Sequence, residues 1–411
     1  MPSARCDIPA VAYVIEAADS ALRAVRAEIA LEDVELVDGR LVGSAVSVES
    51  RCVLVASGAD DELYGCPMEP LTLRDGGLRF DPSGGGIRER RNRDAAGAFN
   101  TVVEEAARFG MVNSYFHATH VAAYFNQLLR EIGAPPLPPV HVVVSAHAGS
   151  KLPGYCSHDG DFRRERMYPF QGGHYRVSTL TTGIPEPVPV RPNGEIHLGP
   201  GIRRAPFAGE ALYLRNAAHN PMTIYHEFGH HLCHHTADFR LNRERAPERQ
   251  RNGKTGPEEG VCDYVVATLL GTGRPYGWYR PTRGAWRDPE AVRTVEAANS
   301  DPHAVGAAWA SALWHTRQAL LHQELIGSPR DHDRALIEAL LTLGSVASRP
   351  GDRRRRPERA TTRSAPETIT AAYFDALRAN AGVRATDAAA RIFAERGLLT
   401  DYAAQGEASP C

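Results

Sequence analysis

The chain has 411 residues, of which 43% are hydrophobic, enough for two or three domains with their own cores. Its formal net charge of −2 gives no general attraction to nucleic acid or to an anionic membrane surface. No apolar stretch of the sequence has the length needed to span a bilayer, so neither a nucleic acid nor a membrane is expected as a partner.

The cysteines and the N-terminal segment indicate the cellular compartment of the protein. Seven cysteines are scattered without a pairing pattern, which favours reduced thiols over a disulfide framework. The segment Met1–Asp7 lacks the basic region and apolar run of a signal peptide. The sequence therefore predicts a cytoplasmic protein, and it does not determine the oligomeric state. The arginine run Arg353–Arg356, with Pro and Thr around it, predicts an exposed loop rather than a nucleic-acid surface.

Residues 1–95 are the first predicted unit, an α/β segment that is either accessory or similar to a propeptide. The apolar spacing of Val11–Ala30 is typical of a helix. Val34–Val55 alternates as β-strands do, and Asp38-Gly39 within it predicts a hairpin turn. This segment contains no recognisable catalytic pattern, so we expect the chemistry to lie further along the chain.

Two helical stretches follow, Asp94–Phe109 and Val112–Ile132. The second contains His117 and His120, three positions apart, which invites a metal-binding interpretation. No acidic partner lies nearby in the sequence, so the favoured interpretation is a pair of histidines at the edge of a packed helix.

The region 140–200 reads as β structure, with strands predicted at Val140–Val144, His174–Leu180 and Glu195–Gly199. A strand close to a metal-binding helix can be an edge strand that pairs with an extended peptide, whatever the sequence of that peptide. An ordinary sheet strand is an equally good interpretation of each one, so the sequence does not identify the edge.

The strongest chemical signal is the HEXXH motif formed by His226-Glu227 and His230. Asn220 is a plausible N-cap and Pro221 suits the first position of a helix, so the motif is predicted to be helical. Histidines four positions apart lie on one face of a helix, where both imidazoles can reach one zinc ion. Glu227 stands where it can hold a metal-bound water and take its proton.

A catalytic zinc site needs a third protein ligand. The metzincin pattern fails, because its glycine and third histidine are replaced by Cys233 and Thr236. Glu259 and Asp263 are four positions apart, so Glu259 can bind zinc while Asp263 accepts a hydrogen bond from a ligand histidine. A solvated acidic helix start would explain Glu258 and Glu259, but not an aspartate inside the apolar run that follows.

Two further segments supply candidate hydrogen-bond donors to an oxyanion. Tyr276 or Tyr279 could donate in the site, although packing is the commoner role for such residues. Asp301 and Pro302 predict the start of a helix and place His303 near its positive end. There, in company with the zinc motif, the histidine is predicted to donate to a developing oxyanion.

These motifs occur in the order found in the fungalysin branch of the thermolysin-like metallopeptidases, and the chain resembles that family over about residues 95–400. The segments that carry the resemblance are Asn113–His117, His226–His230, Glu259–Asp263 and Asp301–Ala310, while Ala390–Gly397 is similar to the last helix of that branch. The two metal segments and the His303 segment are its specific parts.

The resemblance implies a gluzincin with an α+β fold. It would have a two-lobed catalytic unit, with a β-containing upper lobe at 96–236 that includes the zinc helix and a helical lower lobe at 237–411, preceded by the α/β segment 1–95. The implied roles are zinc binding by His226, His230 and Glu259, general base and then acid catalysis by Glu227, support of the ligands by Asp263, and transition-state stabilisation by His303.

The predicted function is a zinc-dependent peptidase that uses a metal-activated water, with intracellular processing of a dedicated peptide or protein substrate. Fungalysins are secreted and carry an Asn-Ala-aromatic substrate strand, and neither an export signal nor that pattern is evident in this chain. One alternative is therefore a zinc hydrolase acting on a non-peptide amide in a biosynthetic pathway. Another is a non-catalytic zinc-bearing binding protein, although a structural zinc would not need Glu227.

Overall fold

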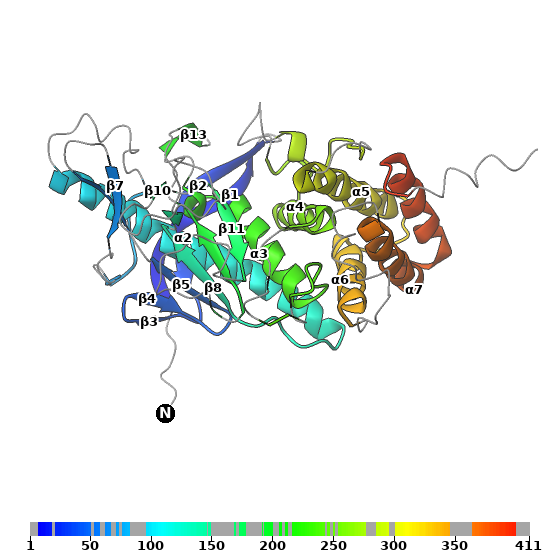
Figure 1. The fold of residues 1–411 in the computed structure, drawn as a ribbon, viewed down its shortest axis with the longest axis horizontal. Helices are drawn as coiled ribbons and strands as arrows, with labels where there is room; N and C mark the ends of the chain where they lie inside the picture. Colours follow the sequence, from blue (N-terminus) through cyan, green and yellow to red (C-terminus); the bar gives the residue numbers. More distant parts are fainter. Residues whose placement is uncertain are drawn as a thin grey trace, which may run out of the picture. The chain divides into compact units, whose positions relative to one another are not determined.

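The computed structural model gives a mixed α and β protein, in agreement with the predicted α+β class (Figure 1). It describes residues 7–18, 21–50, 53–57, 62–66, 71–73, 76–82, 96–145, 147–148, 168–169, 172–177, 191, 193–199, 205–207, 210–212, 216–242, 245–246, 250, 254–276, 285–295, 301–345 and 364–399. The chain forms two compact units. The first unit is Met1–Tyr124, Leu137–His231 and Pro247–Asn252, and the second is Phe125–Pro136, Leu232–Ala246 and Gly253–Cys411. The predicted division at residues 95 and 236 stays a prediction.

A six-stranded mixed sheet organises the first unit. Its strands are β3 (Glu35–Val37), β4 (Arg40–Val42), β5 (Val46–Ser50), β8 (Val140–Val144), β11 (Gly173–Arg176) and β12 (Glu195–Leu198), in the order β11-β12-β8-β5-β4-β3. Strands β5, β8 and β12 are parallel neighbours, whereas β11 pairs antiparallel with β12. Among the described strands β11 is therefore an edge, and residues from the first 95 share a sheet with the later strands.

The start of the chain is a long hairpin rather than a helix. Strands β1 (Ile8–Ala18) and β2 (Ala21–Leu31) pair antiparallel along their whole length, so the helix predicted at Val11–Ala30 is wrong. The main chain of β1 also bonds to Leu78, a partner that helical spacing cannot reveal. The hairpin turn predicted at Asp38-Gly39 is confirmed between β3 and β4, where both residues have positive φ.

Short two-stranded pairs complete the described β structure. They are β6 (Val53–Ser57) with β7 (Glu62–Cys66), β9 (His147–Ala148) with β10 (Tyr168–Pro169), and β13 (Ala205–Phe207) with β14 (Glu210–Leu212). The strands predicted at Val140–Val144 and near residues 174 and 195 are confirmed as β8, β11 and β12.

The main sheet carries buried polar side chains on one face. His141 lies between Ser47, at 2.6 Å from Nδ1 to Oγ, and Glu49, at 3.1 Å from Nε2 to Oε1. On β12, Nε2 of His197 lies 2.8 Å from Oε2 of Glu195, and both residues are buried. These polar groups satisfy one another, so the sheet can be buried on this face as well as on its valine-rich face.

One continuous helix, α2 (Ala96–Glu131), replaces the two helices predicted at Asp94–Phe109 and Val112–Ile132. Gly110 lies inside this helix, where its lack of a side chain serves packing. A Cβ atom at this position would lie 2.9 Å from Cβ of Ala218 and 3.2 Å from Cγ1 of Val144. The missing side chain therefore lets α2 approach both neighbours closely.

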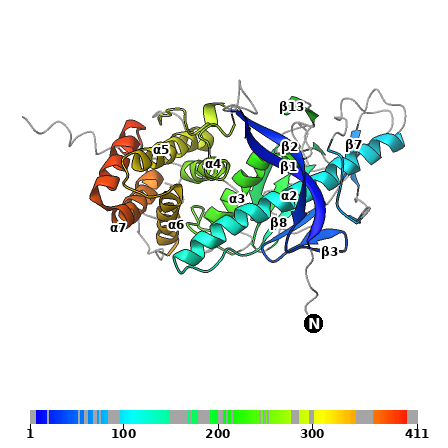
Figure 2. The same cartoon turned by 180° about the vertical axis from the view of Figure 1, so that it is seen from behind.

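Helix α2 anchors the hairpin, which lies across it in Figure 2. The Tyr13 N–H donates to Oδ1 of Asn113 at 2.9 Å, and the Asn113 amide donates to the carbonyl of Ala218. His117 is buried, with Nδ1 at 2.7 Å from the Tyr225 hydroxyl and Nε2 at 2.8 Å from the Tyr13 carbonyl. His117 therefore joins β1 to α3 through two hydrogen bonds, in keeping with the packing role that was predicted for it.

The described part of the second unit is helical. Its elements include η3 (Ala285–Arg287), α4 (Gly256–Leu270), α5 (Pro302–His322), α6 (Pro329–Ser345) and α7 (Ser364–Glu395), which is interrupted at Gly382. Helices α4 and α5 approach closely, since a Cβ on Gly306 would lie 2.6 Å from Cβ of Glu259. In the part of the chain described above, no helix has the length and apolar character that crossing a membrane requires.

Candidate metal centre

Helix α3 (Pro221–His235) carries the HEXXH motif, and it begins as predicted. Asn220 caps it, because its Oδ1 accepts the N–H of Met222 at 3.0 Å, and Pro221 is the first helical residue. A short 3-10 turn, η1 (Ala217–His219), precedes the cap. The predicted helical setting of the motif is therefore confirmed.

His226 and His230 lie one turn apart on α3, and both are buried. Their ring centroids are 5.0 Å apart, and the rings are nearly perpendicular. Glu227 is also buried, with 3% of its surface exposed. The preceding residue, Tyr225, uses its hydroxyl to hold His117 of α2, and burial raises the pKa of Tyr225. The hydrogen bond from Tyr225 to His117 thus holds α3 against α2, while the imidazoles of His226 and His230 lie close together.

The edge strand β11 runs directly beside the general-base candidate. A Cβ atom on Gly173 would lie 2.7 Å from Cγ of Glu227 and 2.8 Å from Cγ2 of Thr223. The hydroxyl of Tyr175 lies 3.2 Å from Nδ1 of His231, further along α3. Glycine at position 173 therefore allows this strand to approach α3 where the carboxylate of Glu227 stands.

Helix α4 carries two neighbouring glutamates with different surroundings. Thr255 caps the helix, and its hydroxyl accepts the N–H of Glu258. The Glu258 carboxylate is buried and paired with Arg240, whose Nε lies 3.0 and 3.1 Å from its two oxygens. Glu258 is therefore held by a structural ion pair, which favours Glu259 as the ligand from this segment.

Two cationic side chains and a histidine lie near the carboxylate of Glu259, which is fully buried. Nζ of Lys254 lies 3.6 Å from its Oε1, while the Arg287 guanidinium and Nε2 of His303 lie 3.6 and 3.7 Å from its Oε2. Nearby positive charge favours the ionised form of a buried carboxylate, and this is the form that binds a metal.

Asp263 is the centre of a hydrogen-bonded group one turn after Glu259. The Arg287 guanidinium forms a two-pronged pair with it, from Nε at 3.0 Å and from an NH2 group at 2.6 Å. The Tyr276 hydroxyl donates to Asp263 at 2.7 Å. Burial, together with the negative charge of Asp263, raises the pKa of Tyr276, so the phenol keeps its proton for this bond. The oxyanion role considered for Tyr276 stays a prediction, and Tyr279 lies outside the described residues.

His303 stands at the start of α5, where Asp301 caps the helix as predicted. Its Nδ1 lies 3.1 Å from Oδ1 of Asp301, and its side chain is 42% exposed. When Nδ1–H donates to Asp301, Nε2 carries a proton only in the imidazolium form. His303 can therefore donate to an oxyanion as the charged ring, oriented by Asp301.

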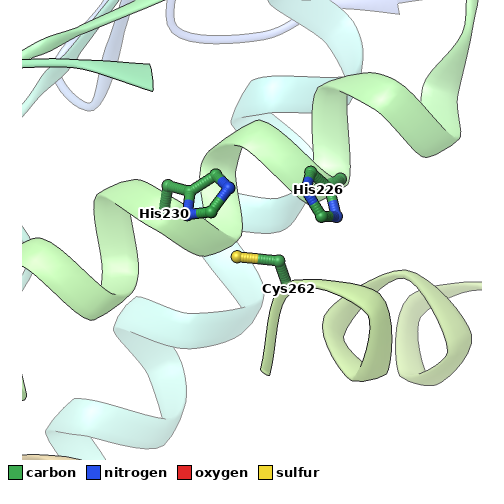
Figure 3. A group of neighbouring side chains, drawn as sticks. All are labelled: His226, His230 and Cys262. Atoms are coloured by element: carbon green, nitrogen blue, oxygen red, sulfur yellow. The ribbon is translucent and has the colours of Figure 1, made fainter. Parts of the chain in front are cut away.

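One group of described His, Cys, Asp and Glu residues could hold a metal ion: His226 and His230 of α3 with Cys262 of α4 (Figure 3). Two imidazoles with a thiolate or carboxylate are a donor set that suits zinc. The expected third ligand, Glu259, lies three positions before Cys262 on α4 and is not in this group. Two imidazoles and a thiol are donors that fit the predicted zinc ion.

Sequence reasoning missed two residues of this region. Cys262 had a signal, because it is a zinc-ligand type three positions after Glu259. Arg287 had none, because nothing in the sequence ties it to Asp263, 24 positions earlier.

Comparison with known proteins gives no assignment. No protein-family model matches the chain, and a search of curated proteins also finds no match.

Proposed function

We propose that this chain is a zinc-dependent peptidase of the gluzincin type, with a thermolysin-like two-lobed catalytic unit. One observation carries the proposal: Glu227, buried between His226 and His230 on α3, lies beside the sheet edge at Gly173. A general base between two metal-binding histidines can deprotonate a metal-bound water. The adjacent edge of the sheet can hold a peptide by main-chain pairing.

In this proposal His226, His230 and Glu259 hold the zinc ion, with Asp263 and Arg287 supporting α4 at the next turn. When bound, zinc would lower the pKa of a water molecule toward neutrality and polarise the substrate carbonyl. Arg287 contributes twice, since it bonds to Asp263 and also lies 3.6 Å from Oε2 of Glu259. It thereby restrains both carboxylates of α4.

The remaining steps belong to the side chains. Glu227 takes the proton from the attacking water and later gives it to the departing nitrogen of the peptide. The imidazolium of His303 donates a hydrogen bond to the developing oxyanion, and a donor of this kind is typically worth about 2.7–4 kcal/mol. Asp301 keeps the ring of His303 in the orientation that this bond needs.

The substrate would be a peptide or protein segment in an extended conformation. Its main chain would pair with β11 and so be held with little regard to sequence. Pairing along Gly173–Arg176 would carry the scissile bond past Glu227. The cytoplasmic location that we propose rests on the seven cysteines of the sequence, which are scattered without a pairing pattern and favour reduced thiols.

Cleavage of a mixed peptide library, read by mass spectrometry, tests the proposal. The zinc-loaded chain should produce defined cuts, and both a chelator and the Glu227→Gln substitution should abolish them. The substitution removes the base but keeps the size of the side chain, so circular dichroism should show an unchanged fold. If the zinc-loaded wild type leaves every peptide intact, the general-peptidase proposal is wrong, and the non-peptide amide or binding alternatives replace it.

A further inference from the structure

One face of the main sheet brings together a serine, a histidine and a glutamate, all within the first unit. Strands β5 and β8 are paired, and Ser47 of β5 lies opposite His141 of β8 (Figure 1). Oγ of Ser47 lies 2.6 Å from Nδ1 of His141, and Oε1 of Glu49 lies 3.1 Å from Nε2 of the same ring. No local pattern indicates this group, because 94 positions separate His141 from Ser47.

The charges around His141 determine where its proton lies. An ionised carboxylate only accepts hydrogen bonds, so Glu49 favours a proton on Nε2 of His141. Nδ1 is then an acceptor, and the hydroxyl of Ser47 donates to it. Arg191, whose Nη2 lies 3.5 Å from Oε2 of Glu49, favours the ionised form of this carboxylate. Burial lowers the pKa of His141, so the ring is neutral at pH 7 and able to take a proton.

The place of Ser47 in the sheet leaves its hydroxyl within reach of solvent. Residues that lie opposite one another form a row across the strands: Glu35, Val42, Ser47, His141, Glu195 and Arg176. The first three are half-buried, and the last three are buried. Ser47 therefore stands where the row becomes accessible, with His141 on its buried side. A half-buried hydroxyl can bond to water, so burial alone does not require its contact with His141.

This row lies on the opposite face of the sheet from the HEXXH helix. Gly173 and Tyr175 of β11 face helix α3. Successive side chains of a strand point to opposite faces, so Arg176, and with it the row that contains Ser47, lies on the other face. The group can therefore act without the proposed zinc ion.

We propose that Ser47, His141 and Glu49 form a second, metal-independent active site that hydrolyses carboxylic esters. Oγ of Ser47 attacks the ester carbonyl while Nδ1 of His141 takes its proton and then gives it to the departing alcohol. A water molecule, deprotonated by the same nitrogen, attacks the acyl-serine, and the proton returns to Oγ as the carboxylic acid leaves. Glu49 stays ionised and stabilises the imidazolium that forms in each step. Esters suit this group because an alcohol leaves more readily than an amine does.

Covalent labelling of the metal-free chain tests the proposal. The full chain, kept in a chelator, is treated with diisopropyl fluorophosphate, and the adduct is mapped by tandem mass spectrometry. We expect an adduct on Ser47 that Ser47→Ala loses. His141→Gln should slow the labelling about 100-fold, since a positioned general base typically contributes about 10²–10⁴ in rate. Ser44→Ala, the matched control, removes an exposed hydroxyl that donates to Asp33 and should be labelled at the wild-type rate.

Hydrolysis of p-nitrophenyl acetate by the same metal-free samples measures turnover, and wild type and Ser44→Ala should be active while Ser47→Ala is not. A folded wild-type chain without an adduct on Ser47 would overturn the proposal, and so would undiminished labelling of a folded His141→Gln variant. An adduct without ester hydrolysis would overturn the proposed activity. If circular dichroism shows that His141→Gln does not fold, Glu49→Gln takes its place, because it removes the charge that orients His141 and should slow the labelling at least about tenfold.

Discussion

Asp263 shows how much of the site depends on single contacts away from the metal. Its carboxylate is buried, and it is held by Arg287 and by the Tyr276 hydroxyl. Removing one partner of a buried ion pair leaves a charge without compensation, which costs far more than losing an exposed pair. The stability of α4 near the proposed ligands should therefore depend on Arg287.

We predict that Arg287→Ala lowers the free energy of unfolding by about 3 kcal/mol, since the buried carboxylate of Asp263 would lose its guanidinium partner. Urea denaturation measures this loss. Arg274→Ala is the control, because Arg274 forms an exposed pair with Glu290 and should change stability by less than about 1 kcal/mol. Equal effects of the two substitutions would show that the Asp263 group does not support the fold.

At the same scale, residue type and spacing predicted much of the site. His226, Glu227 and His230 could be proposed because four-residue spacing on a helix needs no tertiary information. The caps at Asn220 and Asp301 were also predictable, and both are confirmed. The pairing of Asp263 with Arg287 was not, because a contact across a turn-rich segment is decided by the path of the chain.

At the scale of elements, α2 and α3 meet through a buried histidine. His117 bridges the Tyr13 carbonyl of β1 and the Tyr225 hydroxyl of α3. Burial lowers the pKa of His117 to about 3, and burial also lowers that of His219 to about 4. Both rings are therefore neutral in the folded protein, whereas in the unfolded chain they take a proton near pH 6.5.

This difference predicts acid sensitivity. Below about pH 6.5 the unfolded chain binds protons that the folded chain does not, so stability falls as the pH falls toward the folded pKa values. At pH 5 the cost for His117 alone is about 2 kcal/mol. In urea titrations at pH 7.5 and 5, His117→Gln should lose less stability on acidification than wild type. The exposed His322→Gln is the control, and an unchanged pH dependence in His117→Gln would contradict the assignment.

Two elements show where residue spacing along the sequence fails to predict secondary structure. The apolar spacing of Val11–Ala30 fits a helix, but pairing of β1 with β2 and with Leu78 makes it a hairpin. The two helices predicted at Asp94–Phe109 and Val112–Ile132 are one helix, and Gly110 lies inside it, where Ala218 and Val144 occupy the space of a side chain. In both cases the partner is distant in the sequence, and tertiary contacts override local propensity.

At the scale of the whole molecule, the chain has a β-rich unit that contains His226, Glu227 and His230, and a helical unit that contains Glu259, Cys262 and His303. The mixed α and β class could be predicted from alternating and helical patterns along the chain. The identity of the edge strand could not, because strand order follows from long-range pairing.

Zinc content shows whether the HEXXH helix of this chain holds a metal ion. The purified full chain, dialysed against zinc and then against metal-free buffer, should retain one zinc ion per chain by elemental mass spectrometry. His230→Ala should lose it, whereas Glu227→Gln should keep it, because the general base is not a ligand. A folded wild-type chain that retains no zinc would contradict the proposed zinc site, and so would retention by His230→Ala equal to that of wild type.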